Sequence, residues 1–156
     1  MRYFPLYTLT HLGAFAAGIA LGIYILPILT AAPPPAETEI ASAMQGETLT
    51  AEFRRDLKGS DFFHWGEGSV SVTAKAIVHR GTLAPGPDYR LYLVPGNPED
   101  AAEFRALKDK SVQIAEIRGF SGFIAPVPPG VDVNAYSSVV IWCERFGKFI
   151  SAARYR

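Results

Sequence analysis

The sequence predicts a mainly β fold: a β-sandwich or open barrel-like domain with one short inserted helix, preceded by a single transmembrane helix. An apolar run without charged residues near the N-terminus predicts the membrane helix. After it, apolar and polar residues alternate in several short segments, which is typical of half-buried strands. The 14 glycines and 12 prolines suit a turn-rich β domain better than a helical bundle.

The apolar run extends from Leu12 to Ala32. As a helix it would be about 31 Å long, enough to cross a hydrocarbon core of about 30 Å. A cleaved signal peptide is the competing interpretation, because residues 29–32 include the small side chains of a cleavage site. Pro33 directly after that site and the length of the run favour an uncleaved signal anchor over residues 1–32.

Charges on the two sides of the run predict its orientation. Arg2 precedes the run, whereas Glu37 and Glu39 follow it. The positive-inside rule therefore places the N-terminus in the cytoplasm. We expect a single-pass protein of the inner (plasma) membrane, with its C-terminal domain on the periplasmic or extracellular side.

Ala14, Gly18 and Gly22 recur at four-residue spacing and so share one face of the predicted helix. Small residues at this spacing let two membrane helices approach closely, which predicts a weak homodimer through the transmembrane helix. The alternative is that glycine and alanine are simply common in such helices.

Residues 33–46 begin with Pro33, Pro34 and Pro35. Three prolines favour an extended polyproline II conformation, which predicts a short, stiff stalk. Residues 37–44 could instead form one or two helical turns.

Residues 47–156 carry the predicted β domain. In residues 69–78, valine and alanine alternate with polar residues, which predicts one half-buried strand with His79 at its end. Gly81 and residues 85–88 supply turns. Further strands are predicted over residues 89–95, 112–117, 137–143 and 148–155.

One helix is predicted between these strands, over residues 98–110. Asn97 is a suitable cap and Pro98 suits the first helical position. Lys108 and Lys110 lie at the end where positive charge is favourable. Its brevity predicts an insertion packed at the edge of a sheet.

Charge and motifs limit the classes of function. The 15 basic and 15 acidic residues balance, so we expect no nucleic-acid partner. The sequence contains no P-loop, no GxSxG, no HExxH and no paired CxxC. These absences favour a non-enzymatic module, and the sequence identifies neither a metal site nor a cofactor.

Cys143 is the single cysteine, so no intrachain disulfide can form. It follows four apolar residues at 139–142, and free cysteines in such strands are usually buried packing residues. A strand would place Val139 and Ile141 on the face of Cys143, and we expect partial burial of its thiol. His64 precedes a glycine-containing segment, where it would be either a hydrogen-bonded turn histidine or a polar neighbour of Cys143.

The segment 136–146, with its sequence Ile141-Trp142-Cys143, resembles the C-terminal signature of the DM-thirteen domain family. Residues 59–64, 68–70, 86–93 and 117–126 resemble earlier blocks of the same family in order. The resemblance covers residues 47–156. It implies an extracytoplasmic β-rich domain in which the characteristic cysteine, here Cys143, serves a redox or electron-transfer role.

Two functional hypotheses follow. In the first, the domain is a redox accessory module centred on Cys143, acting on another membrane or redox protein; Arg145 or His64 could supply the polar surroundings that a reactive thiolate requires. In the second, the domain binds a ligand or a protein through its loops, and Cys143 is an inert core residue.

Overall fold

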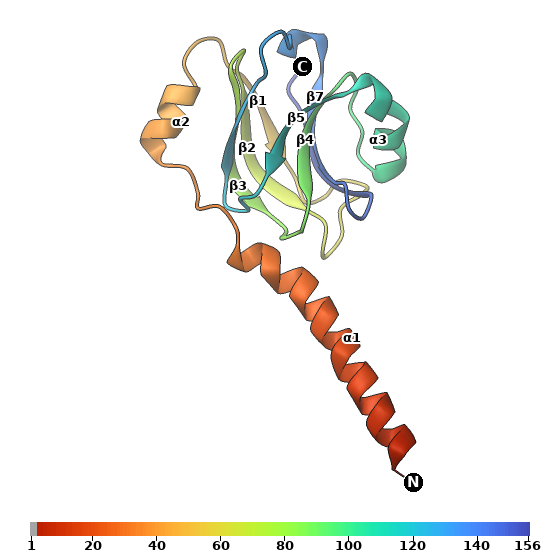
Figure 1. Ribbon diagram of the computed structural model, residues 1–156. Coiled ribbons are helices and arrows are strands. Elements are labelled where there is room, and N and C mark those ends of the chain that lie inside the picture. Colours follow the sequence, from red (N-terminus) through yellow and green to blue (C-terminus); the bar gives the residue numbers. More distant parts are fainter. Residues whose placement is uncertain (1–2) are drawn as a thin grey trace.

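The computed structural model of the protein describes residues 3–156. A long N-terminal helix leads into one β domain, with short helices on two sides of the sheets (Figure 1). The helices are α1 (Phe4–Leu29), α2 (Glu37–Ala43) and α3 (Ala101–Leu107). The strands are β1 (Leu49–Phe53), β2 (Gly66–Val72), β3 (Ala76–Leu83), β4 (Tyr89–Val94), β5 (Val112–Ile117), β6 (Phe123–Pro126), β7 (Ser138–Cys143) and β8 (Lys148–Arg154).

The strands form two four-stranded antiparallel sheets, in the orders β1-β2-β3-β6 and β5-β4-β7-β8. The edges of the sheets approach each other, β1 toward β8 and β5 toward β6. This confirms the predicted mainly β fold, a sandwich whose edges nearly close. The central pair of the second sheet, β4 and β7, joins segments far apart in sequence and places Tyr89 opposite Cys143.

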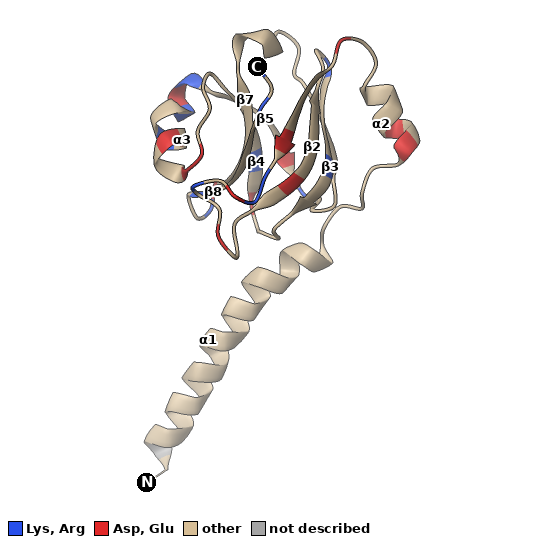
Figure 2. Ribbon diagram, turned by 180° about the vertical axis from the view of Figure 1, so that it is seen from behind, with Lys and Arg blue, Asp and Glu red and all other residues tan. Residues whose placement is uncertain are grey.

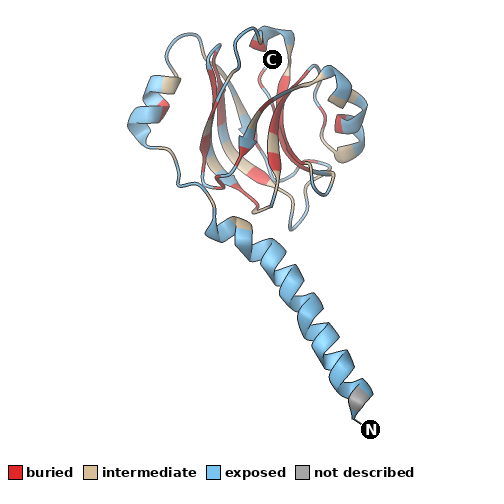
Figure 3. Ribbon diagram, viewed as in Figure 1, coloured by how far each residue is buried: buried red, intermediate tan, exposed pale blue. Residues whose placement is uncertain are grey.

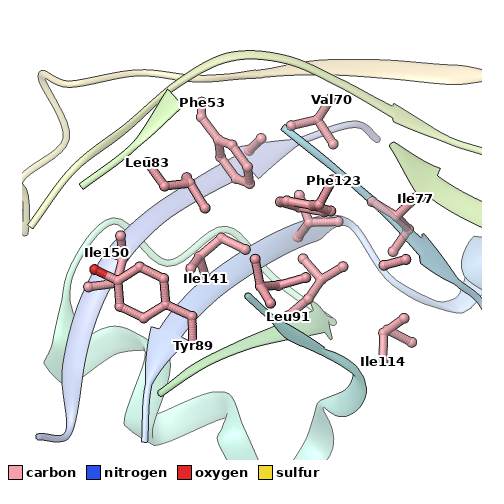
Figure 4. Close-up of a cluster of buried hydrophobic side chains, with 14 of the residues drawn as sticks. Phe53, Val70, Ile77, Leu83, Tyr89, Leu91, Ile114, Phe123, Ile141 and Ile150 are labelled. Carbon is pink, nitrogen blue, oxygen red and sulfur yellow. The ribbon is translucent and has the colours of Figure 1, made fainter. Parts of the chain in front are cut away.

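The main core fills the space between the two sheets (Figure 4). Alternate residues of each central strand point into it, as the two-residue period of a strand requires. In β7 these residues are Val139, Ile141 and Cys143. Val140 and Trp142 point to the other side, where they pack beneath α3. The predicted division of the β7 side chains between two apolar faces is therefore confirmed.

The prediction of one strand over residues 69–78 is wrong. The segment is a hairpin: β2 ends at Val72, Ala74 lies exposed in the turn, and β3 begins at Ala76. The Thr73 N–H donates to the Ala76 carbonyl at 2.9 Å, and the Ala76 N–H donates to the Thr73 hydroxyl at 3.0 Å. A threonine hydroxyl thus closes the turn without glycine or proline, so the usual sequence signal was missing. His79 lies within β3, fully buried, and not at a strand end.

The inserted helix begins later than predicted. Asp100, not Asn97, caps α3, because its carboxylate accepts the Glu103 N–H at 2.9 Å. The helix ends at Leu107 and a short 3₁₀ turn follows over Lys108–Lys110. Phe104 lies fully buried against Trp142 on the outer face of the second sheet. Strands β1 and β6 were not among the predicted strands. Of the two predictions for residues 37–44, the helical one is confirmed, because this segment forms α2.

Helix α1 stands clear of the β domain for most of its length, with its side chains exposed (Figure 3). Residues Pro5–Leu29 are long and apolar enough to cross a membrane, a property that a signal sequence shares. Just after the C-terminal end of α1, Ala31 packs against the main core and the Ala32 N–H donates to the Arg118 carbonyl at 3.0 Å. Arg2, on which the predicted orientation depends, lies outside the described residues.

Candidate functional site

Cys143 is the last residue of β7 and lies at the end of the sandwich nearest α1. Its side chain is 2% exposed, so the thiol is more deeply buried than the partial burial expected from the sequence. The chain turns immediately afterwards, over residues 144–147. The cysteine therefore combines a core position with closeness to a loop.

A cavity of about 140 Å³ adjoins Cys143. His64 lines the same cavity, so the fold brings together the two residues that the sequence singled out. The wall is otherwise largely apolar and aromatic, and it comes from the C-terminal part of α1, the loops before β2 and β4, the loop after β7, and β8. Its other lining residues include Ile23, Tyr24, Phe63, Gly86, Tyr89 and Phe146.

Burial raises the pKa of the Cys143 thiol, because a thiolate loses its hydration in the core. Interactions with the backbone of Phe146, Asp88 and Arg145 act in the opposite direction without cancelling the effect of burial. The thiol is thus protonated at neutral pH. If a thiolate formed there, these backbone groups would partly stabilise its charge.

His64 is held by a tight loop. Asp61 accepts the backbone N–H groups of Phe63 at 2.7 Å and His64 at 2.8 Å, and its other carboxylate oxygen lies 2.8 Å from the His64 Nδ1. Partial burial pushes the pKa of Asp61 up, but the bonds to His64 and Phe63 outweigh it and leave that pKa below its usual value. The structure shows no hydrogen bond between the His64 ring and the Cys143 thiol within residues 3–156.

The loop before β4 depends on a glycine. A Cβ atom at Gly86 would lie 2.4 Å from the Tyr89 ring, so only glycine lets the loop close over that ring. The Tyr89 hydroxyl donates to the Ala84 carbonyl at 2.8 Å and holds the start of the same loop. Burial raises the pKa of Tyr89, which keeps its hydroxyl protonated as a donor.

Tyr89 and the α1 residues Ile23 and Tyr24 also line this cavity and were not predicted from the sequence. The signal available was the turn segment 86–88 directly before β4, which predicted a turn and contributed to the family resemblance but did not point to a site. Pairing of β4 with β7 could not be inferred from local periodicity, because the antiparallel partner lies about fifty residues later.

A larger cleft of about 640 Å³ lies between the C-terminal part of α1 and the neighbouring loops. Leu26 and Pro27 form its helix side, whereas the domain side carries charges of both signs, from Arg118 and Arg145 and from Asp88 and Glu116. Figure 2 shows that Lys, Arg, Asp and Glu are confined to the domain and α2, while α1 carries none over its described length. The cleft therefore joins an apolar wall to a charged one.

The remaining site residues do not gather near Cys143. Ala14, Gly18 and Gly22 lie along the exposed α1, and nothing lies within 4 Å of the Cβ position at Gly18 or Gly22. Helix pairing there stays a prediction. The described residues 3–156 contain no group of three or more histidine, cysteine or acidic side chains arranged to hold a metal ion.

Comparison with known proteins agrees with the resemblance seen in the sequence. Searches of curated proteins and of solved structures gave no match. A family model described as Electron transfer DM13 matches residues 56–155, which is well over half of the chain and nearly all of the β domain. The matched region includes Cys143, His64 and every domain loop around their cavity. The chain therefore belongs to the Electron transfer DM13 family.

Proposed function

We propose that this chain is a single-pass membrane protein whose DM13 domain acts outside the cytoplasm as a redox accessory module, with Cys143 as its redox group. The observation that carries the proposal is the placement of Cys143 on a cavity that His64 also lines, next to the loop after β7. Membership of an electron-transfer family supports the same class of function.

Anchoring of the domain is supported by the contacts at the end of α1. Ala31 and Ala32, the residues of the candidate cleavage site, belong to the folded domain through the main core and the bond to the Arg118 carbonyl. Ile23 and Tyr24 also line the Cys143 cavity. A helix that completes the domain in this way favours an uncleaved anchor.

The proposed reaction is thiol–disulfide exchange. The Cys143 thiol loses its proton, and the thiolate attacks one sulfur of a disulfide in a partner protein or small thiol compound. The disulfide breaks, a mixed disulfide forms at Cys143, and the departing sulfur leaves with the electron pair and takes up a proton. Since the chain has no second cysteine, a thiol of another molecule must release Cys143. No step requires a metal or a bound cofactor.

Thiol labelling of the full-length protein in membranes tests the proposal. We expect a thiol reagent to modify the folded protein at neutral pH, and expect Cys143→Ser to abolish the reaction while the protein stays folded. Raising the pH should speed the reaction, because the Cys143 pKa is raised and more thiolate forms. A protein that is labelled only after denaturant is added would contradict the redox proposal.

A binding module is the second candidate, and the 2% exposure of Cys143 favours it. The 640 Å³ cleft lies within the range of about 300–1,000 Å³ that is typical of small-molecule sites. In this case Cys143→Ser would strongly destabilise the domain, and the native thiol would not react. Substitutions that line the cleft, such as Arg145→Gln, would then alter binding without affecting any thiol chemistry.

A further inference from the structure

Three aromatic side chains stand out on the surface of the β domain. Phe62 is 86% exposed, Phe63 is 61% exposed and Phe146 is 51% exposed. Within residues 33–156, all of which the structure describes, no other large hydrophobic side chain is exposed. Exposed aromatic residues gathered in one place usually mark a contact with a partner or a membrane.

These residues lie together at the end of the domain that meets α1. Phe63 and Phe146 line the Cys143 cavity with Ile23 and Tyr24, although they come from loops far apart in sequence. Phe62 and Phe63 line a neighbouring pocket, also with Tyr24. The Phe62 and Phe63 rings meet edge to face, with centroids 4.9 Å apart. We call Phe62, Phe63 and Phe146 the aromatic rim.

Tyr24 of α1 indicates the depth at which the aromatic rim lies. The candidate membrane span covers Pro5–Leu29, and Tyr24 lies five residues, about 8 Å along the helix axis, before its C-terminal end. Tyrosines favour the two membrane–water interfaces, where the ring is apolar and the hydroxyl is hydrated. If α1 crosses a membrane over this span, Tyr24 lies close to one interface, and the aromatic rim, whose residues line two pockets with Tyr24, lies at the same level.

The charged residues around the aromatic rim are compatible with a position at the membrane–water interface. Arg145 precedes Phe146, is exposed, and has no acidic partner within ion-pair distance in the described part of the chain. Arg55 packs its guanidinium 3.4 Å from the centre of the Trp65 ring and also pairs with the Glu67 carboxylate at 2.7 Å. The nearby acidic residues Asp61 and Asp88 are held by His64 and Arg90.

We propose that the aromatic rim inserts at the boundary between acyl chains and headgroups in the outer leaflet of the membrane that holds α1. The inference rests on the proposed anchoring of the chain. It adds that the domain lies on the bilayer in a fixed orientation, with the loops around Cys143 against the lipid. Aromatic and apolar side chains bury about 5–10 Å into this boundary when a protein lies on a membrane.

Tryptophan reporters in the full-length protein test this inference. The protein is placed in phosphatidylcholine vesicles with or without bromine on the acyl chain near the headgroup, and the parent emission from Trp65 and Trp142 is subtracted. We expect brominated lipid to lower the Phe62→Trp signal by about twofold or more, as contact with the acyl boundary requires. Ala74→Trp is the matched control, because Ala74 is exposed in the hairpin turn at the opposite end of β2 and β3. Its signal should not change.

A third reporter separates failure of the aromatic rim from failure of the anchor. Phe15 lies near the middle of α1, so Phe15→Trp should be quenched by lipid brominated deep in the acyl chain. Quenching of Phe15→Trp with an unquenched Phe62→Trp would overturn the aromatic-rim inference and leave the anchor intact. An unquenched Phe15→Trp would overturn the anchor. The Phe62→Trp emission could instead shift to the blue as the protein-to-lipid ratio rises, equally in brominated and unbrominated lipid. That result would indicate contact with a second copy of the protein and would also overturn the inference.

Discussion

Tyr89 and Cys143 face each other across the β4–β7 pair, and each side chain is 2% exposed. The Tyr89 hydroxyl donates to the Ala84 carbonyl at 2.8 Å, so this tyrosine connects the strand opposite Cys143 to the loop that covers the cavity. We therefore expect the burial of the thiol to depend on this hydrogen bond of its cross-strand neighbour.

Tyr89→Phe should release this loop. The Ala84 carbonyl would lose its donor, and an unsatisfied buried carbonyl costs about 1–3 kcal/mol. We expect a lower free energy of unfolding and faster labelling of Cys143 in the folded protein. Tyr136→Phe is the matched control, because Tyr136 is half-buried and its hydroxyl has no hydrogen-bond partner within residues 3–156. Equal labelling rates in both variants would show that the Tyr89 hydroxyl does not hold the cavity closed.

Phe104→Ala should detach α3 from the second sheet. The ring is fully buried and packs against Tyr92 and Trp142, with centroids 5.3 and 5.0 Å away. Truncation of a buried phenylalanine usually costs about 3–5 kcal/mol. Phe62→Ala, at an exposed position, should change the free energy of unfolding by less than about 0.5 kcal/mol in detergent. Denaturant unfolding of the two variants checks this, and similar losses in both would contradict the assigned packing.

His79 should make the domain sensitive to mild acid. Burial between Phe53 and Phe123 lowers the pKa of His79 below the ordinary histidine value of about 6.5. Its Nε2 bonds to the Glu67 carbonyl at 3.0 Å, whereas its Nδ1 has no partner, so protonation would place an unpaired N–H in the core. The unfolded chain accepts this proton more readily. The contribution of neutral His79 to the free energy of unfolding is therefore fully present above about pH 6.5. Below that pH the free energy of unfolding falls by up to about 1.4 kcal/mol per pH unit.

His79→Gln provides the comparison, since glutamine keeps a donor for the Glu67 carbonyl but does not titrate. The free energy of unfolding, measured from pH 7.5 downward to about pH 5.5, should fall less steeply in the variant. Identical slopes in the two proteins would assign the acid sensitivity to other groups.

The proposed orientation predicts which side of the membrane carries the domain. In intact spheroplasts, added protease should degrade the domain and a tag fused to the C-terminus after Arg156. A cytoplasmic control protein should survive the same treatment. Protection of the tag until the membrane is disrupted would reverse the orientation inferred from Arg2, Glu37 and Glu39.

Local patterns in the sequence predicted most of the fold. β-forming residues between turn signals identified β4, β5 and β7 closely, and alternation identified β8, because each strand contributes side chains to the main core. Alternation also misled at residues 69–78, where a hydroxyl-closed turn interrupts the pattern without disturbing its period. Strand β6 is only four residues long, too short to show a period.

The candidate site was predictable only in part. Cys143 and His64 could be singled out as residue types, and the family resemblance gave Cys143 a role. Their meeting at one cavity depends on sheet pairing and on the end of α1, which are non-local features. The depth of Cys143 burial likewise follows from the loops at 85–88 and 144–147 that cover the strand end, and those loops have no periodic signal.

The central claim is that Cys143 is a redox-active thiol in the folded, membrane-anchored protein. Intact-mass measurement after incubation of the full-length protein with oxidised glutathione at neutral pH tests it most directly. The account predicts a glutathione adduct on the folded protein that added thiol reverses and that Cys143→Ser cannot form. An adduct that appears only in denaturant, with none on the folded protein, would contradict the claim and leave Cys143 as a packing residue.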